Sequence, residues 1–328
     1  MLIIDGHCDS ILDFHHGKRL FYGQPNHSTN PTSTEDQPQS NQGHVDYSRL
    51  RKAGVGVQFF ALFTGDEYVH RAYDYTLELL DTFDQLVTPD KPMKKVLNSS
   101  HILECYNSQT LGALLTIEGG EPIGDSLERL GEFYHRGVRL MTLTWNRQNA
   151  IARGVRAEGS EGLTAFGRKV VREMETLGMI IDGSHLSDQA LDDVLHYCTQ
   201  PIVASHSNSR ELLGHPRNLT DQQMNQIAQT GGLIGLTFAG VFVDSDPKKV
   251  TLERAMEHLD RLIHQAGIDH VGIGSDFDGF TAPYGLVMDD CTGLPAIAQG
   301  LRDRGYSEED VEKVMGLNWL RVVQQVVG

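Results

Sequence analysis

Short runs of apolar and β-branched residues recur along the chain, and each run is followed by a stretch with helical features. Continuous apolar runs of this length are typical of parallel strands that are buried on both faces. We therefore predict eight strands, at Leu2–Asp9, Val55–Phe63, Leu111–Glu118, Val138–Trp145, Met179–His185, Pro201–His206, Leu233–Phe238 and His270–Asp276.

The segments between these runs carry the signals of helices. Apolar residues recur at helical spacing in Tyr68–Val87, Leu163–Leu177, Thr251–Ala266 and Ser307–Val327. Ser187 and Thr220 each precede an acidic or amide-rich first turn, so we predict that both are N-caps.

Eight strand–helix units predict an α/β protein of the (β/α)8 TIM-barrel type, a fold that takes about 250 residues and accepts insertions. A doubly wound open sheet has the same alternation of strands and helices, so alternation by itself leaves both architectures open. The count of eight favours the barrel. We expect a single domain over residues 1–328, because no stretch of the sequence resembles a linker.

One segment departs from this pattern. Residues 17–43 are rich in Ser, Thr, Asn, Gln and Pro and contain few apolar residues. We interpret the segment as a polar excursion after the first strand. It is either a mobile surface segment or a lid over the end of the barrel where active sites form.

Composition narrows the range of partners. The chain has 28 Lys and Arg residues against 44 Asp and Glu residues, and its formal net charge of -16 argues against nucleic acid or an anionic membrane surface. No run approaches the length of a membrane span, and the N-terminus lacks the features of a secretory signal. We therefore expect a soluble, cytoplasmic protein that acts on a small molecule.

The cysteines give no sign of a disulfide framework or a zinc ribbon. They are scattered, at Cys8, Cys105, Cys198 and Cys291. Reduced thiols are the expectation for such a pattern. Cys8 stands between two possible metal ligands, but on a strand its side chain points away from both neighbours, so we interpret it as a packing residue.

Residues that can bind a metal stand at the ends of several predicted strands. They are His7, Asp9, Glu118, His185, His206 and Asp276. Any one of them could be an ordinary structural residue. Together, however, these groups would meet at the end of a barrel where active sites form, and burying so many polar groups is costly unless a cation compensates them. Imidazole nitrogens and carboxylate oxygens suit a divalent ion such as zinc.

Two ions account for this set better than one. His7 and Asp9 share a face of the first strand and can hold one ion, because residues two apart in a strand point the same way. His185 and His206 can hold a second ion, with Glu118 between the two. Asp276 is then left as a base or proton shuttle. A mononuclear site is also compatible with the sequence.

At these positions the sequence resembles the membrane dipeptidase (renal dipeptidase) family of zinc metallopeptidases, within the amidohydrolase-like barrels. The matching stretches follow one another from residue 5 to residue 279: Asp5-Gly6-His7-x-Asp9, Ile117-Glu118-Gly119-Gly120, Ser184-His185, Ser205-His206-Ser207, Pro216-Arg217-Asn218 and Gly274-Ser275-Asp276-Phe277-Asp278-Gly279. The resemblance implies two Zn²⁺ ions per chain, with Glu118 as the bridging carboxylate.

The resemblance also implies roles for residues that do not bind metal. Asp276 matches the catalytic acid/base. Arg217 matches an arginine that helps to bind the substrate, and a guanidinium is well shaped to hold the C-terminal carboxylate of a dipeptide. Asn218 lies in the same matching stretch and is expected to line the substrate site. Family analogy further suggests a homodimer.

One position departs from the family pattern. Many members carry a histidine after the fourth strand that contacts the substrate or the oxyanion, and Trp145 stands at that place here. Tryptophan can pack against a substrate and donate its indole N–H, but it cannot be an imidazolium. We therefore expect Trp145 to contact the substrate, and Asn146 or the metals to stabilise the oxyanion.

The hypothesis that follows is hydrolysis of the peptide bond of a dipeptide by a metal-bridging hydroxide, with Asp276 carrying the proton to the leaving amine. The same metals could instead serve a lactonase, an N-acyl amino-acid amidohydrolase or a phosphoesterase, because a barrel fold does not fix the substrate. A metal-binding scaffold descended from a hydrolase is the remaining alternative.

Overall fold

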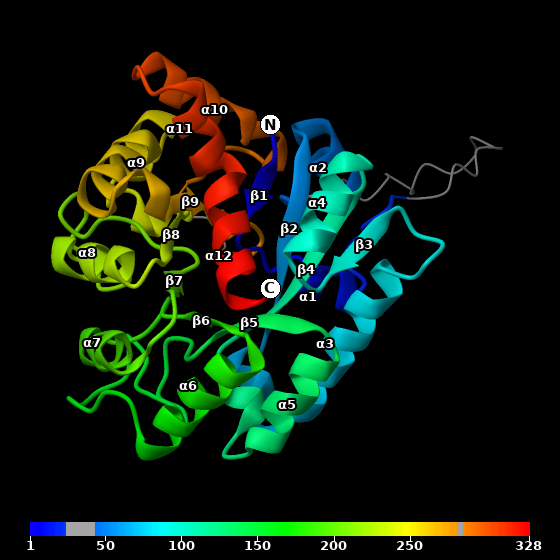
Figure 1. Ribbon diagram of the computed structural model, residues 1–328, viewed down its shortest axis with the longest axis vertical. Helices are drawn as coiled ribbons and strands as arrows, with labels where there is room; N and C mark the ends of the chain where they lie inside the picture. The colour runs from blue at the N-terminus through cyan, green and yellow to red at the C-terminus, as the bar shows by residue number, and fades with distance from the viewer. Residues whose placement is uncertain (24–42, 281–284) are drawn as a thin grey trace, which may run out of the picture.

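Eight parallel strands close into a ring in the computed structural model, which describes residues 1–23, 43–280 and 285–328 (Figure 1). The strands of the ring are β1 (Ile3–Asp5), β2 (Val55–Phe63), β4 (Leu111–Glu118), β5 (Val138–Thr142), β6 (Ile180–Asp182), β7 (Ile202–Ala204), β8 (Leu233–Leu236) and β9 (Val271–Ile273). Strand β1 pairs with both β2 and β9, and β2 pairs with β4, so the ring has no open edge. The predicted TIM barrel is confirmed, and the open sheet is excluded.

A further strand, β3 (Met93–Val96), was not predicted. It pairs with the first half of β4, while β5 pairs with the second half of β4. The run Met93-Lys94-Lys95-Val96 carries two lysines, and the side chain of Lys94 is exposed. A short strand outside the ring has one solvated face, so it lacks the continuous apolar run that marks the buried strands.

Helices surround the ring of strands (Figure 1). They are α1 (Ile11–His15), α2 (Tyr47–Ala53), α3 (Ala72–Leu86), α4 (Ser99–Asn107), α5 (Leu127–His135), α6 (Ala165–Leu177), α7 (Asp188–Tyr197), α8 (Asp221–Gln229), α9 (Leu252–Ala266), α10 (Pro295–Asp303), α11 (Glu308–Glu312) and α12 (Asn318–Val326). Both predicted N-caps are present, because Ser187 accepts from the backbone N–H of Ala190 and Thr220 forms a capping box with Gln223. The helix predicted from Tyr68 begins only at Ala72, after a 3-10 segment at Asp66–Arg71.

The last predicted helix, Ser307–Val327, is interrupted. A π-helical segment at Lys313–Leu317 separates α11 from α12. Within it, a side chain at Gly316 would bring its Cβ to 2.4 Å from the carbonyl oxygen of Leu2, so the helix can approach β1 this closely only with glycine there. The irregular turn lets the C-terminal segment lie across the amino end of the barrel.

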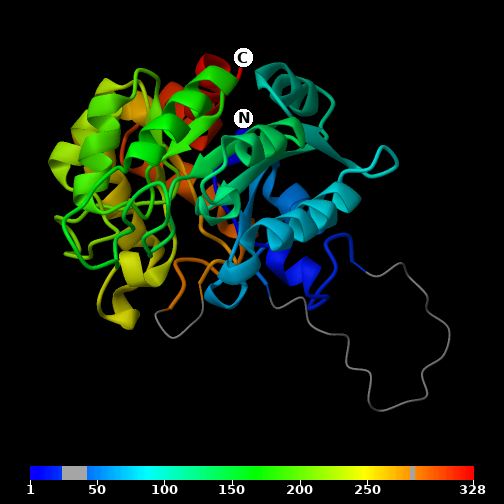
Figure 2. The same ribbon diagram turned by 90° about the horizontal axis from the view of Figure 1, so that it is seen from below.

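That end of the barrel is filled by apolar side chains. Trp319 of α12 is fully buried, packs on Phe59 with ring centroids 5.0 Å apart, and donates its indole N–H to the carbonyl oxygen of Ile273. Figure 2 shows both chain ends on one side of the molecule and α1 on the opposite side. The amino end of the barrel is therefore a packed core, and the carboxyl end is left for polar chemistry.

Three further predictions concern the rest of the chain, and each has a different outcome. Residues 24–42, most of the predicted polar excursion, lie outside the described residues. Cys8 is fully buried and belongs to the apolar core, which agrees with its interpretation as a packing residue. Of the helices that the structure describes, none is both long and apolar enough to cross a membrane.

Candidate metal centre

The predicted metal ligands come together at the carboxyl end of the barrel. Most of them lie just beyond a strand, and Glu118 is the last residue of β4. Predicted strands that ran through His7, His185, His206 and Asp276 were therefore too long. The chain leaves the regular ladder here, and His185 and Asp276 adopt left-handed backbone with φ of 69° and 63°. Such conformations are uncommon for residues with a Cβ and cluster at functional sites.

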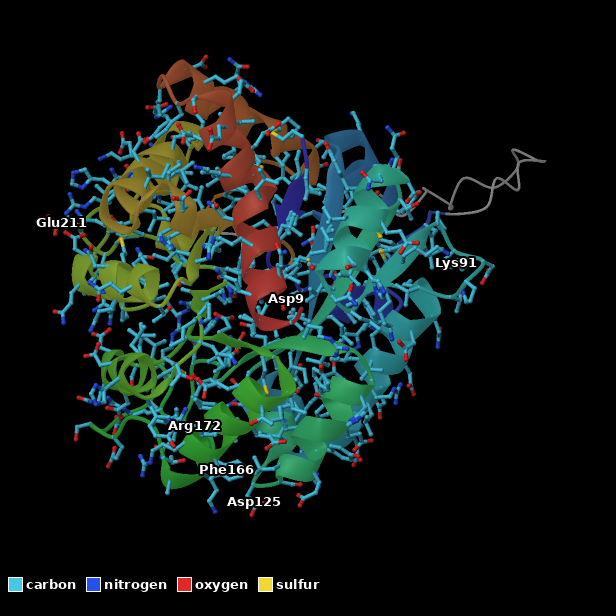
Figure 3. The ribbon with its side chains drawn as sticks, in the orientation of Figure 1. Asp9, Lys91, Asp125, Phe166, Arg172 and Glu211 are labelled. Atoms are coloured by element: carbon cyan, nitrogen blue, oxygen red, sulfur yellow. The ribbon has the colours of Figure 1, made fainter. Side chains whose placement is uncertain are left out.

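All five predicted ligands are buried. Their exposed fractions are 1% for His7, 2% for Asp9, 4% for Glu118, 7% for His185 and 1% for His206. Figure 3 shows Asp9 near the middle of the molecule in this view, whereas Lys91 and Glu211 lie at its edges. Buried polar groups need partners, so the question is what these side chains bind.

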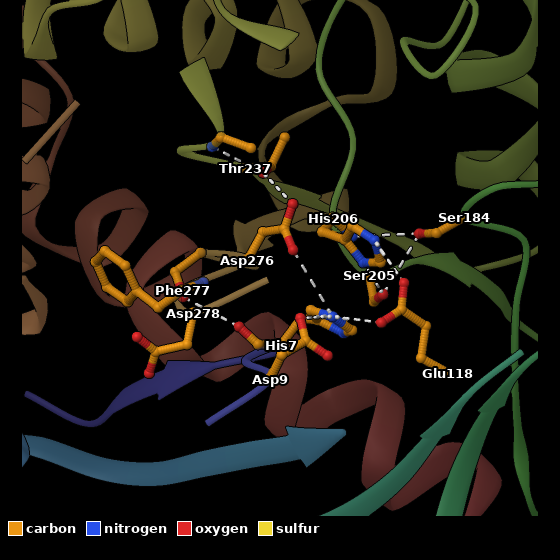
Figure 4. Close-up of polar contacts among 12 residues, drawn as sticks. His7, Asp9, Glu118, Ser184, Ser205, His206, Thr237, Asp276, Phe277 and Asp278 are labelled. Atoms are coloured by element: carbon orange, nitrogen blue, oxygen red, sulfur yellow. Dashed lines mark hydrogen bonds and ion pairs between the residues drawn. The ribbon is translucent and has the colours of Figure 1, made fainter. Parts of the chain in front are cut away.

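Glu118 contacts histidines with both of its carboxylate oxygens, and Figure 4 shows its side chain beside those of His7 and His206. Its Oε2 is 3.5 Å from Nε2 of His7, and its Oε1 is 2.9 Å from Nε2 of His185 and 3.8 Å from Nε2 of His206. On the first side, Nε2 of His7 is also 3.3 Å from Oδ2 of Asp9. The carboxylate thus faces a different group with each of its oxygens.

Two cation-sized groups of ligand atoms share Glu118. One consists of His7, Asp9 and Glu118, and the other of Glu118, His185 and His206; within each group all ligand atoms lie within 4.8 Å of one another. A third group of the same size joins His7 and His206 to Asp276. The arrangement can hold two divalent ions with one bridging carboxylate.

Several of these atoms have no hydrogen-bond partner in the described part of the chain. They include both ring nitrogens of His7 and Oδ1 of Asp9. A buried polar atom without a partner costs about 1–3 kcal/mol. A divalent ion would satisfy one ring nitrogen of His7 and the carboxylate of Asp9, so the donor set fits a metal, and nitrogen and carboxylate ligands are those that zinc takes.

The protonation of the histidines fits the same picture. Burial lowers the pKa of His185 to about 3, and burial with the nearby His7 and Arg217 lowers the pKa of His206 well below its ordinary value. Neutral imidazole is the form that binds metal. Burial alone would lower the pKa of His7 as well, but the carboxylates of Asp9 and Glu118 outweigh it and raise that pKa well above its usual value. His7 therefore lies where positive charge is favoured.

Neighbouring side chains orient the predicted ligands, a role that the sequence did not indicate, since it suggested Asn146 only for the oxyanion. Nδ1 of His185 lies 3.0 Å from Oδ1 of Asn146. Because an amide oxygen only accepts, Nδ1 carries the ring proton and Nε2 presents its lone pair to the centre. The pattern Thr-Trp-Asn after β5 marked this loop, but nothing local in the sequence pairs Asn146 with a histidine 39 residues away.

Asp5 acts on His7 through the backbone, because its carboxylate accepts from the backbone N–H of His7 at 3.5 Å. Its buried carboxylate accepts from the backbone N–H and the hydroxyl of Ser275, at 2.8 Å and 2.6 Å, and from the amide of Gln58 at 2.9 Å. These bonds join β1 to β2 and to the loop after β9. The backbone segments that carry His7 and Asp276 are therefore held in place relative to each other. In the sequence, Asp5 stood out only as the first residue of Asp5-Gly6-His7, two positions before the predicted ligand His7.

Asp276 lies at the edge of the centre. Its Oδ1 is 3.9 Å from Nε2 of His7, its Oδ2 is 3.5 Å from the hydroxyl of Thr237, and its exposed fraction is 7%. Burial raises the pKa of Asp276 to about 7, although His7 acts in the opposite direction. A carboxyl group with a pKa in this range can both accept and release a proton near neutral pH.

Arg217 is also brought to the site. It is 4% exposed, it donates to the carbonyl oxygen of His206 at 3.1 Å and to the hydroxyl of Ser207 at 3.4 Å, and its Nε has no hydrogen-bond partner among the described residues. Both acceptors are neutral. Burial lowers the pKa of Arg217 to about 10, so the guanidinium stays charged and is suited to an anionic ligand.

The other two predicted substrate contacts differ from each other. The amide nitrogen of Asn218 lies within 3.4 Å of the carbonyl oxygens of Ser209, Leu213 and Phe242, so it joins loop segments rather than facing open space. Trp145 is partly buried; its ring packs on Phe63 at 5.1 Å and lies 6.2 Å from the ring of His185. Trp145 is therefore next to the centre, and Asn218 supports the loop that carries Arg217.

Known proteins resemble this chain over nearly its whole length. The model of the membrane dipeptidase family (peptidase family M19) matches residues 1–327. Dipeptidase tcpJ of Claviceps purpurea is 31% identical over 297 residues, covering 87% of this chain and 69% of that protein. An uncharacterised dipeptidase of Schizosaccharomyces pombe is 32% identical over 298 residues, covering 85% of this chain and 71% of that protein.

A solved structure is similar in fold and sequence. A metallopeptidase of Rhodobacter sphaeroides, liganded with a phosphinate mimic of the dipeptide L-Ala-D-Ala, superposes with a TM-score of 0.85. The two chains are 27% identical, and the match covers 99% of each.

Proposed function

The chain belongs to the membrane dipeptidase family of metallopeptidases, and from this premise we propose that it hydrolyses dipeptides at a centre of two zinc ions. One ion would be held by His7, Asp9 and Glu118, and the other by Glu118, His185 and His206. The observation that carries this proposal is the position of Glu118, whose two carboxylate oxygens face different histidines at 3.5 Å and 2.9 Å.

The ions would supply the electrophilic part of the chemistry. When bound, the ions would lower the pKa of a nearby water molecule and polarise the carbonyl group of the substrate. The protein residues provide the remaining functions: they bind and orient the dipeptide and move one proton.

We assign the proton transfer to Asp276. Hydrolysis of a peptide bond requires that the attacking water lose a proton and that the leaving nitrogen gain one. Asp276 lies beside the proposed centre, with Oδ1 3.9 Å from Nε2 of His7, where its carboxylate can take the proton from water and then donate it to the amine. The left-handed backbone at Asp276 sets the direction of its Cα–Cβ bond.

We assign recognition of the C-terminal carboxylate of the dipeptide to Arg217. The guanidinium is buried, its hydrogen bonds go to neutral acceptors, and its Nε has no partner among the described residues. A buried cation of this kind is stabilised when a carboxylate pairs with it. An anchor this close to His206 would place the C-terminal residue of the substrate next to the centre.

Trp145 is proposed to line the space for a side chain of the substrate. Its ring is held from behind by the guanidinium of Arg147, 5.0 Å from the ring centroid, and by Phe63. An indole fixed in this way offers an apolar wall next to His185. We expect dipeptides with apolar side chains to be good substrates. A C-terminal D-residue belongs in the test, because a relative binds a mimic of L-Ala-D-Ala.

One experiment separates this function from its rivals. The purified protein is analysed for bound metal and then assayed, with zinc supplied, against dipeptides, N-acyl amino acids, lactones and phosphotriesters. We expect about two equivalents of zinc and turnover of dipeptides above all other classes. Turnover of a lactone or an N-acyl amino acid without turnover of any dipeptide would overturn the peptidase assignment.

A further inference from the structure

A buried chain of hydrogen bonds runs from Asp182 through Ser205 to His206. Asp182 ends β6 and Ser205 directly follows β7. The hydroxyl oxygen of Ser205 lies 2.6 Å from Oδ2 of Asp182 and 2.8 Å from Nδ1 of His206. Asp182 and Ser205 are fully buried. Figure 4 shows Ser205 directly beside the ring of His206.

The direction of the proton in this chain follows from Asp182. Its Oδ1 accepts from the backbone N–H groups of Ser184 and Ser205, at 3.0 Å and 2.9 Å. Its Oδ2 accepts from the hydroxyls of Thr142 and Ser205, at 2.7 Å and 2.6 Å. Because the single hydroxyl proton of Ser205 is donated to Asp182, Ser205 can only accept from Nδ1 of His206.

This direction fixes the tautomer of His206. With the ring proton on Nδ1, the lone pair of Nε2 points toward Nε2 of His185, which is 2.9 Å away and which Asn146 holds in the same tautomer. Two lone pairs at this distance repel each other unless both bind one cation. In the other tautomer, the N–H at Nε2 of His206 would donate a hydrogen bond to Nε2 of His185, and neither nitrogen would be free to bind an ion.

We infer that Asp182 and Ser205 are positioning residues that hold His206 in its Nδ1–H tautomer and thereby keep the His185–His206 pair open to a divalent ion. The inference rests on the proposed two-metal function and names the residues that prepare one of its two sites. Outer hydrogen bonds of this kind fix ring orientation and increase the basicity of the ligand nitrogen.

Asp182→Asn is the sharpest variant for testing this inference, because it keeps size and shape. The two backbone N–H groups that face Oδ1 require an oxygen there, so the amide nitrogen takes the place of Oδ2. It then donates to Ser205, and Ser205 must donate its own proton to Nδ1 of His206. The ring proton moves to Nε2, where a metal would bind.

Two further variants accompany it. Ser205→Ala removes the hydroxyl that joins Asp182 to His206, whereas Ser205→Thr keeps a hydroxyl and should keep this connection. Thr142→Val is the matched control, since it removes a hydrogen bond of 2.7 Å to the same carboxylate oxygen of Asp182 without touching His206. If a loss of zinc affinity came merely from disturbing Asp182, Thr142→Val would show an equal loss.

The measurement is metal binding by the full chain, made metal-free and titrated with Zn²⁺ in competition with a chromogenic chelator. We expect two ions in the wild type. In Asp182→Asn and Ser205→Ala the affinity for one ion should fall about 10- to 100-fold while the other is kept, the usual range for such partners. Ser205→Thr and Thr142→Val should bind like the wild type. Thermal unfolding of the metal-free variants identifies any that fail to fold.

A second readout does not depend on metal. In metal-free protein with ¹⁵N-labelled histidine, the nitrogen shifts of His206 should report a protonated Nδ1 in the wild type and a protonated Nε2 in Asp182→Asn. The same tautomer in both proteins, or equal loss of affinity in Thr142→Val, would overturn the inference. A wild type that binds no ion would instead count against the proposed function, since the tautomer measurement would still decide the inference.

Discussion

The guanidinium of Arg217 donates a hydrogen bond to the carbonyl oxygen of His206 at 3.1 Å. The proposed anchor of the substrate and a proposed metal ligand are therefore fixed to each other through the backbone. In the proposed function this contact would relate the position of the substrate's carboxylate to that of the metal ligand. It also explains why a residue 11 positions away from a ligand belongs to the same site.

Replacement of Arg217 by methionine should weaken substrate binding selectively. A hydrogen bond to a charged group contributes about 1.5–3 kcal/mol, which corresponds to about a 10- to 150-fold lower kcat/KM for dipeptides. The measurement compares each dipeptide with its C-terminal amide: the wild type should prefer the free acid, and Arg217→Met should not. Arg302→Met is the control, since Arg302 of α10 pairs with the exposed Glu308 of α11 at 2.6 Å and should leave that preference intact.

Replacement of Glu118 by glutamine should weaken both metal sites together. Glu118 is the shared member of the two ligand groups, and the amide loses the charge that two cations require. We expect fewer than two bound ions by elemental analysis and at least about a 100-fold loss of turnover, in the upper range for perturbed metal sites. Glu121→Gln is the control for metal content, because Glu121 belongs to neither ligand group and pairs instead with Arg147 at 3.0 Å. Full metal content in Glu118→Gln would contradict the bridging role.

Replacement of Asp276 by asparagine should separate metal binding from catalysis. Asparagine tolerates the left-handed backbone that this position adopts, so the loop should keep its shape. Loss of a general acid–base group lowers kcat by about 10²- to 10⁴-fold. Both ions should remain bound, as measured on the same sample. Unchanged turnover would remove Asp276 from its proposed role.

Replacement of Gly279 by alanine should disturb the proposed metal centre through a steric clash. A Cβ at this position would lie 2.2 Å from Oδ2 of Asp9 and 2.5 Å from Oδ1 of Asp276, so one of these carboxylates has to move. We expect lower zinc affinity and lower kcat in Gly279→Ala, measured by competition titration and initial rates. Gly214→Ala serves as the control, because a Cβ at Gly214 meets no atom within 4 Å and should change neither quantity.

His258 should make the folded state less stable in acid. The buried ring accepts from the backbone N–H of Ser209 and lies 2.9 Å from the carbonyl oxygen of Val243, so it is held neutral. Burial lowers the pKa of His258 to about 4 from an ordinary 6.5. Because the unfolded state takes up a proton below pH 6.5 and the folded state does not, stability falls as the pH drops from there toward 4.

The size of this effect can be measured by difference. Each pH unit between the two pKa values contributes about 1.4 kcal/mol, so the contribution of His258 amounts to about 3 kcal/mol at pH 4. Urea unfolding of metal-free wild type and of His258→Gln, between pH 7 and pH 4, should show a shallower loss of stability in the variant. Parallel curves for the two proteins would contradict the prediction.

The sequence by itself determined the class of fold and the chemical character of the site. The eight buried strands were readable because a strand covered on both faces must be apolar throughout, as in Leu111–Glu118. The candidate ligands were readable because polar residues end several of these runs, as Glu118 ends Leu111–Glu118, and together they indicate the mouth of a barrel. The signal for each strand is local, whereas the signal for the site rests on several strand ends taken together.

Only the tertiary structure decided how these residues meet. Strand β3 and the π-helical segment at Lys313–Leu317 left no pattern in the sequence, because each depends on what packs against it. The same holds for Asp5 and Ser275, 270 residues apart and joined across the closure of the ring. Hydrogen bonds between distant residues follow from strand register, and a sequence without its fold contains the donors and acceptors but not the pairs.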